Sequence, residues 1–516
     1  MYPEQNYPMP PESQKPTYTV TDTAYAWLSL LMAFLFCQTS PLAEHPLGAF
    51  LLILGLFITG FVILLVQKRK LSPACILSAL SSVVIGAAPL LTDTLFLIRL
   101  SMAYSLGSYL YFLYAAFGNR IEEGFSDYIY IDYMKVLILQ PFSSLGAIFP
   151  ALANKSAKNF SGVLLKIIFG VVIAIIPTVL VFLFLAYDKD FVKLLDKIFS
   201  FELADIGRTI RSLIFTLPLG MYGFGLYAAA QRKAMHDKLT PEICNRGLQQ
   251  IKVLPQVTAV VAVLPILFLY AVFFISQWKY YVSGFTGVLP EDFSYAEYAR
   301  RGFFELCSVS VINLVLIVGL SLLMKRGKRG AGVFLKILTT AFCLCTLVLI
   351  STAVAKLIMY IDSYGLTQKR IYAMWLMALI AIVFLLIALG QFIRKFKTVA
   401  LCFTVAVVMF AGLAVCNVNA LCAQYNADRY LSGTLETIDV QAMKELGDSA
   451  VPSLVRLVTE MDGEKDPKLK DQITSVLRLE LNALKTEKAS VFSFSIPSAQ
   501  AKAALKEYAA PAPQND

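Results

Sequence analysis

The sequence predicts an all-α polytopic membrane protein, with a bundle of about eleven spanning helices and a small C-terminal helical domain. Separate apolar stretches of about 18 to 25 residues run from Ala24 to about Ala414, each long enough to cross a hydrocarbon core about 30 Å thick. They lack the period-2 alternation of a barrel, so the spans must be helices. Of the 516 residues, 58% are hydrophobic and only 16% charged, unlike a soluble globular chain.

The chain begins with a segment rich in Pro, Tyr and Gln at residues 1–23, which has no signal-peptide pattern and is expected to be a disordered cytoplasmic tail. The membrane bundle is expected at residues 24–416. Its spans are predicted at residues 24–38, 47–66, 72–91, 95–117, 163–186, 209–229, 253–275, 303–324, 333–358, 371–393 and 398–416.

One further stretch, residues 134–153 (MKVLILQPFSSLGAIFPALA), could be a twelfth span. Its Lys135, Gln140, Pro141 and Pro150 instead favour an interfacial or re-entrant segment, because polar and helix-breaking residues are poorly placed in a lipid-exposed helix. With that assignment, the number of spans stays at eleven.

The net charge of +10 could indicate nucleic acid, but the basic residues stand in short clusters beside apolar ends. Examples are QKRK at 67–70, KRGKR at 325–329 and RKFK at 394–397. If the N-terminus is cytoplasmic, these loops all face inward, as the positive-inside rule requires. The sequence therefore predicts a lipid bilayer partner, no nucleic-acid partner, and an extracytoplasmic C-terminus.

Residues 417–516 have the composition of a small helical domain outside the cytoplasm. Helices are predicted at 439–446, 448–460, 467–488 and 498–509, with Asp448 as an N-cap and Gly447 ending the helix before it. In VPSLVRLV and ITSVLRLELNAL, apolar residues recur at helical spacing. The tail helices are expected to need one another, a partner or the bundle to cover these faces.

The chain offers little material for catalysis. It has two histidines and nine cysteines, and no cysteine pair is joined by further ligands at zinc spacing, so we expect no metal, no cofactor and no disulfide framework. The glycines at 223 and 225 lie inside an apolar span, where small residues permit close helix packing and do not form a phosphate loop.

The segment DFSYAEYARRGFFELCSVSVINL (292–314) carries the most polar pattern at a membrane end. Ser294 and Glu297 form a capping box that starts a helix, along which Glu297, Arg301 and Glu305 follow at i, i+4 and i+8. A carboxylate at the position of Glu305 needs a partner within the membrane, and Arg301 is the expected one. Either the two form a structural ion pair, or the stripe belongs to a functional site.

Other polar residues are expected at the same membrane level. Together they define a predicted outer recess that is net positive and suits an anionic lipid head group or the acidic segment of a protein partner. Its candidate residues are Arg99, Gln277, Glu297, Tyr298, Arg300, Arg301, Glu305 and Arg370.

Several motifs resemble those of known membrane proteins: SYAEYARRGFFEL, FFISQWKYYVSG, YGLTQKRIYAMW, NVNALCAQYNADRYL and LGDSAVPSLVRL. They resemble bacterial multipass membrane proteins of the domain-of-unknown-function families 4153 and 4173, from about the fourth span to about residue 457. The resemblance implies a bacterial plasma-membrane protein with a C-terminal soluble portion. It implies no activity, substrate or catalytic residue.

Three classes of function remain. A non-enzymatic scaffold or sensor acting through the outer tail needs the fewest assumptions, since catalytic groups are scarce. A transporter or lipid-handling protein for an anionic substrate would line its pathway with Arg99 and the Glu297, Arg301 and Glu305 stripe. A membrane-embedded transferase acting on a lipid-linked substrate would need a carboxylate base, for which Glu305 or Glu297 is the candidate.

The charge asymmetry generates a topology prediction. A reporter fused after Asp516 should be active outside the cytoplasm, whereas one inserted in the 325–329 loop should be active inside it, because Lys and Arg are retained on the cytoplasmic side. Paired phosphatase and fluorescent-protein fusions measure both positions. A cytoplasmic signal from the C-terminal fusion would contradict the eleven-span topology.

Overall fold

The chain is predominantly helical in the part that the structure, a computed structural model, describes. That part comprises residues 18–38, 45–153, 203–232, 239–276, 295–325, 329–393, 395–461, 466–486 and 490–509. Within it, the only β pairing is one isolated bridge between Leu254 and Met324. The predicted all-α fold class is confirmed.

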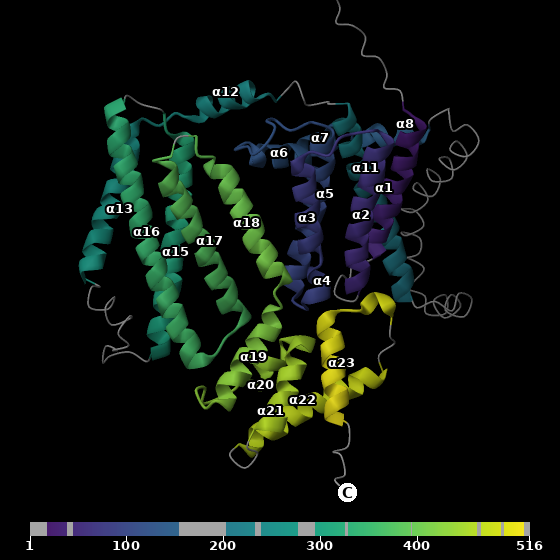
Figure 1. Ribbon diagram of the computed structural model, residues 1–516, viewed down its shortest axis with the longest axis vertical. Coiled ribbons are helices and arrows are strands. Elements are labelled where there is room, and N and C mark those ends of the chain that lie inside the picture. The colour runs from purple at the N-terminus through teal and green to yellow at the C-terminus, as the bar shows by residue number, and fades with distance from the viewer. Residues whose placement is uncertain are drawn as a thin grey trace, which may run out of the picture. The chain divides into compact units, whose positions relative to one another are not determined.

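Ten helices of the described part are long and apolar enough to cross a membrane, and they confirm that the protein is polytopic (Figure 1). Each coincides with a predicted span; the remaining predicted span, 163–186, lies outside the described residues. The ten are α1 (Val20–Gln38), α2 (Pro46–Val66), α3 (Pro73–Gly86) with α4 (Ala88–Leu91), α5 (Leu95–Ala116), α11 (Leu203–Gln231), α13 (Gln256–Ser276), α15 (Tyr295–Leu323), α16 (Arg329–Tyr364), α17 (Gln368–Gly390) and α18 (Thr398–Val415).

The helices belong to two compact units, residues 1–40 with 136–234, and residues 41–135 with 235–516. In the first unit α1 packs closely on α11, because α11 presents glycine to its neighbours. A Cβ at Gly220 would lie 2.7 Å from a methyl carbon of Leu30, and one at Gly225 would lie 2.7 Å from the carbonyl oxygen of Pro141. The glycines of this span therefore serve packing, as the sequence predicts.

The stretch 134–153 is a broken helix. With the residues just before it, the stretch comprises α6 (Ile129–Met134), a π-helical turn (Lys135–Leu139), α7 (Gln140–Ser143), a 3-10 turn (Leu145–Ala147) and α8 (Ile148–Leu152). Its two arms are bent by 53°. Counted as one span, this pair would raise the number of candidate spans to eleven.

Contacts within the first unit favour a re-entrant or interfacial course for this stretch. The Tyr222 hydroxyl donates to the carbonyl of Leu137 (2.6 Å), and the Thr23 hydroxyl donates to that of Ala151 (2.8 Å). The hydroxyl of Tyr227 on α11 donates to Asp22, the residue before Thr23 on α1. The Thr23 contact therefore lies near the level of Tyr227, which is five residues, or about 7.5 Å along α11, from Tyr222. In an unbroken crossing helix, the 14 residues from Leu137 to Ala151 would separate the two carbonyls by about 21 Å.

The basic loops of the second unit gather at one end. The Arg69 guanidinium lies 5.4 Å from the centre of the Phe117 ring, Lys397 donates to the carbonyl of Phe125, and the Asp127 carboxylate accepts from the amide of Ala400 (3.0 Å). These contacts join the loops after α2, after α5 and before α18. The C-terminal helices lie at the opposite end of the same unit (Figure 1).

The tail forms a small helical layer. Its elements are α19 (Val418–Leu431), α20 (Val440–Lys444), the 3-10 turn η4 (Gly447–Ala450), α21 (Val451–Glu460), α22 (Pro467–Thr486), the 3-10 turn η5 (Val491–Ser493) and α23 (Ile496–Ala509). The apolar positions Leu454, Leu457, Ile473 and Leu477 are buried together, as their helical spacing predicts. The prediction of Asp448 as a cap is wrong: the 3-10 turn comes first, and Ala450 precedes α21.

Helix α19 is essential to this layer. It packs on α21, and its Val418, Cys422 and Ala423 are buried in the same hydrophobic core as Leu454 and Leu457. The fragment 430–516, which lacks most of α19, should therefore be only marginally helical, because short helices without packing are weak in water.

A fragment starting at residue 417, which keeps α19, should instead melt cooperatively. Circular dichroism of the two reduced fragments during heating measures the difference. Equal melting of both would contradict the structural role of α19.

Candidate functional site

The described structure contains side chains for only part of the predicted outer recess. They belong to Arg99, Glu305 and Arg370. For α15, the helix begins at Tyr295, directly after the predicted capping residue. The other predicted recess side chains lie outside the described part: Gln277, Glu297, Tyr298, Arg300 and Arg301.

Glu305 interacts electrostatically with a lysine of the neighbouring helix. Helices α15 and α16 pack side by side, and this packing brings the Glu305 carboxylate within electrostatic range of the Lys356 ammonium on α16. Glu305 lies about 15 Å beyond the start of α15, and Lys356 about 12 Å before the end of α16, at 1.5 Å per residue. Lys356 is thus an electrostatic partner of Glu305 that the spacing along α15 alone did not predict. Arg99 is exposed on α5.

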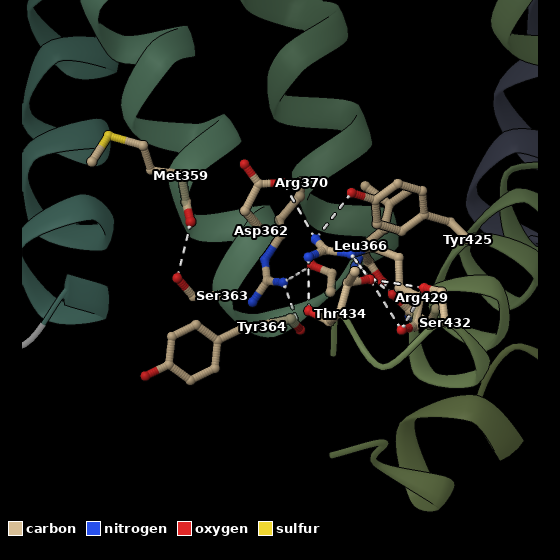
Figure 2. A network of polar contacts seen from close by, with 12 residues as sticks. Met359, Asp362, Ser363, Tyr364, Leu366, Arg370, Tyr425, Arg429, Ser432 and Thr434 are labelled. Carbon is tan, nitrogen blue, oxygen red and sulfur yellow. Dashed lines mark hydrogen bonds and ion pairs between the residues drawn. The ribbon is translucent and has the colours of Figure 1, made fainter. Parts of the chain in front are cut away.

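Arg370 stabilises the turn between α16 and α17 (Figure 2). Its guanidinium donates to the carbonyls of Tyr364 (3.1 Å) and Gly365, and lies 4.1 Å from the centre of the Tyr360 ring. A cation at this position complements the unpaired carbonyls at a helix C-terminus. These contacts account for an arginine at position 370 without a bound ligand.

The same turn is bonded to α19. The Asn426 side chain donates to the carbonyl of Leu366 (2.8 Å) and accepts from its amide (2.6 Å). Arg429 pairs with Asp362 (3.3 Å) and donates to the carbonyl of Thr434 (2.9 Å) (Figure 2). The tail is therefore held to the α16–α17 turn by directional bonds as well as by apolar packing.

The most completely bonded polar group at this end is the side chain of Asn419, near the start of α19. Its oxygen accepts from the Thr94 hydroxyl (3.0 Å) and the Gln368 amide (2.6 Å). Its nitrogen donates to Asp93 (2.7 Å) and to the carbonyl of Leu446 (3.0 Å). A carboxamide has two acceptor positions and two donors, so its capacity is used fully, and the residue is only 3% exposed.

Asp93 and Asn417 extend this arrangement into the tail. The second oxygen of Asp93 accepts from the amide of Ser449 (3.1 Å), and the Ser449 hydroxyl is bonded to the Asn417 carboxamide (2.9 and 3.1 Å). Asn417 also caps α19 through the amide of Ala420 (3.1 Å). We call this set the Asn419 junction. Its members are Asp93, Thr94, Gln368, Asn417, Asn419, Leu446 and Ser449.

At the opposite end of the second unit lies a buried cluster that the sequence analysis missed, the Asp132 cluster. Asp132 is 0% exposed and accepts from the Tyr114 hydroxyl (2.5 Å) and the amide of Ile121 (3.1 Å). Lys135 is 1% exposed and donates to the carbonyl of Asn119 (3.3 Å). The cluster comprises Tyr114, Asn119, Ile121, Asp132 and Lys135.

One polar atom of this cluster stands out. The second carboxylate oxygen of Asp132 is buried and accepts no hydrogen bond from the described residues. The signal in the sequence was an acid and a base three residues apart in the apolar run YIYIDYMKVLIL, where each charge is costly unless it is paired. In the sequence analysis, Lys135 served as a sign of an interfacial segment and was not related to Asp132.

The described residues contain no group of three or more His, Cys, Asp or Glu side chains able to hold a metal ion. The model of one protein family, described as a domain of unknown function (DUF4153), matches residues 79–457. The chain belongs to the DUF4153 family. Neither the curated proteins nor the solved structures include a match to this chain.

The DUF4153 match contains both polar arrangements, since the Asp132 cluster and the Asn419 junction lie between residues 79 and 457. It ends within α21 and does not include α22 and α23. The resemblance to family 4153 is confirmed, and that to family 4173 stays a prediction. Membership brings no assigned reaction, so the function has to be argued from the geometry.

The contact between Asp93 and the tail generates a stability prediction for this DUF4153 protein. Gly447 has a φ of +68°, and a Cβ there would lie 2.8 Å from the Asp93 carboxylate. Gly433 has a similar φ of +73°, but a Cβ there would meet no atom within 4 Å. Gly433→Ala should cost about 1 to 2 kcal/mol of backbone strain.

Gly447→Ala should cost more than this control, because it also displaces the carboxylate that binds Ser449. Thermal unfolding of the purified protein in detergent, together with limited proteolysis of the tail, measures both variants. Equal losses of stability would show that the Asp93 contact contributes nothing beyond the turn.

Proposed function

We propose that this multi-pass membrane protein is a non-enzymatic scaffold or sensor whose C-terminal helical domain acts together with the membrane helices. The observation that supports the proposal is the Asn419 junction. One fully bonded carboxamide joins the loop before α5, the start of α17 and the tail. A domain fixed in this way responds to the helices on which it rests.

The physical basis is the cost of an unpaired buried polar group. If α17 moved relative to α5, Asn419 would lose Gln368 or Thr94 at a site that is closed to water, and a buried unsatisfied group costs about 1 to 3 kcal/mol. The tail would have to shift to restore the bonds. A change in the bundle is thus transmitted to the surface that the tail presents to a partner.

We propose the orientation from the positive-inside rule. The basic loops of the second unit lie at the end opposite the tail, and such loops remain in the cytoplasm. The N-terminus would then be cytoplasmic and the tail extracytoplasmic, in the plasma membrane of a bacterium, as the family resemblance implies.

The outer recess stays a proposal within this scheme. Exposed Arg99 and the interacting Glu305 and Lys356 supply charged groups to it. Arg301 and the remaining stripe residues would complete a site for an anionic lipid head group or an acidic segment of a protein partner.

A second candidate function is transport or lipid handling, and the Asp132 cluster favours it. Ionisable residues buried in membrane proteins often mark pathways. Here the base, Lys135, begins a π-helical turn in a broken helix, and the acid, Asp132, lies three residues earlier in α6. π-helical turns, such as the one that Lys135 begins, and discontinuous helices both occur frequently at binding sites.

Complementation of a deletion strain, at matched membrane levels, separates the two candidates. For a scaffold or sensor, Asn419→Leu should fail because it removes the junction, whereas Asp132→Asn should complement. Gln472→Leu, a change at an exposed position of α22, is the control for a new apolar side chain in the tail.

For a transporter the pattern should be the reverse, with loss in Asp132→Asn and little effect of Asn419→Leu. Full complementation by Asn419→Leu would therefore refute the role proposed for the junction.

A further inference from the structure

The tail carries an exposed apolar segment that its own core does not use. Between α22 and α23, Val491 is 78% exposed, Phe492 55%, Phe494 50% and Ile496 40%. Four large apolar side chains are thus exposed within six residues, and such concentrations of apolar surface often mark sites of interaction with a partner or a membrane. The segment lies beyond the residues matched by the family model.

The exposed apolar segment lies beside the first turn of a spanning helix. Turn η5 packs against the first turn of α2, where a Cβ on Gly48 would lie 3.8 Å from the Cβ of Phe492. Helix α2 is one of the spanning helices, so its first turn lies where the hydrocarbon begins. In Figure 1 the yellow chain before α23 approaches the start of α2.

Helix α2 shows which of its faces is exposed. The side chains of Leu51, Ile58, Val62 and Leu65 are exposed, and their spacing of seven, four and three residues places them on one stripe. Gly48 precedes Leu51 by three residues and belongs to the same stripe. The apolar segment of the tail therefore continues the lipid-facing stripe of α2 beyond the end of the helix.

Serine side chains of the segment form hydrogen bonds with its own backbone groups. Ser490 accepts from the amide of Phe492 (3.3 Å), Ser493 donates to the carbonyl of Ser490 (2.7 Å), and Ser495 accepts from the amide of Ser498 (3.3 Å). These local bonds satisfy polar groups that would otherwise need water, which lowers the cost of entering the membrane interface.

We propose that Val491, Phe492, Phe494 and Ile496 form a wedge that inserts into the bilayer surface beside α2, with the boundary between head groups and acyl chains as its ligand. Aromatic side chains are favoured at this depth, and the wedge attaches the tail to lipid as well as to the bundle. The inference is independent of the proposed scaffold or sensor function, since it concerns only the contact between the tail and lipid.

Tryptophan quenching in nanodiscs tests the wedge. The full-length protein with Phe492→Trp is placed in phosphatidylcholine nanodiscs with or without lipid brominated near the glycerol end of the acyl chain. The emission of the parent, which arises from Trp27, Trp278 and Trp375, is subtracted. Ser475→Trp, at an exposed position of α22, is the matched control.

The added emission of Phe492→Trp should be shifted to the blue and quenched at least about twofold, because the indole lies among the acyl chains at the interface. That of Ser475→Trp should be unchanged by the bromine. Val491→Trp, at a position more exposed than Phe492, should behave like Phe492→Trp. It replaces Phe492→Trp in the experiment if that variant does not fold.

Quenching of Phe492→Trp and Val491→Trp no stronger than that of Ser475→Trp would overturn the proposal. A second copy of the chain or a soluble protein covering the apolar segment would produce that result, because either would shield the indole from brominated lipid.

Discussion

A peptide group inside hydrocarbon has no water to bond to, and the architecture follows from that constraint. Each spanning segment satisfies its backbone as a helix, while turns and irregular stretches are confined to the ends or packed against other helices. The broken stretch between α5 and α11 obeys the same rule. Its carbonyls at Leu137 and Ala151 are satisfied by hydroxyls of Tyr222 and Thr23, so the broken helix remains compatible with a membrane protein.

Because of the same constraint, a few buried polar groups strongly affect how the helices and the tail are arranged. Between apolar helices many arrangements have similar energies, since lipid is as apolar as leucine. A carboxamide such as that of Asn419 accepts only one geometry, in which Asp93, Thr94, Gln368 and Leu446 all meet it. Directional bonds of this kind define the place of the tail, and apolar burial then stabilises it. Gly447 allows the close approach, because any side chain there would meet the Asp93 carboxylate.

The two ends of the second unit use charge differently. At the end with the basic loops, Asp132 and Lys135 are buried in one polar cluster, and Asp132 keeps an oxygen without a protein donor. At the tail end, Arg370 and Arg429 are occupied by helix-end carbonyls and by Asp362. The first arrangement resembles a site that has hydrogen-bonding capacity left, and the second a structural connection. This contrast is why the junction supports a scaffold or sensor while the Asp132 cluster supports the alternative.

The sequence by itself determined the properties that depend on local physics. Apolar length sets the spans, the spacing of Leu454, Leu457, Ile473 and Leu477 identifies the faces of the tail helices, and the motifs indicate the DUF4153 family. The spans and the helix faces follow from hydrogen bonding and burial within single helices, so a local pattern is enough to predict them.

Only the tertiary structure decided which polar groups meet. Asn419 lies 326 residues from Asp93 in the sequence, and no periodicity relates them. Glu305 could be assigned a partner four residues away along its own helix, but its interaction with Lys356 depends on how α15 and α16 pack. Pairing of this kind is set by the packing of whole helices, and the energy of that packing is spread over many weak contacts that a local pattern does not encode.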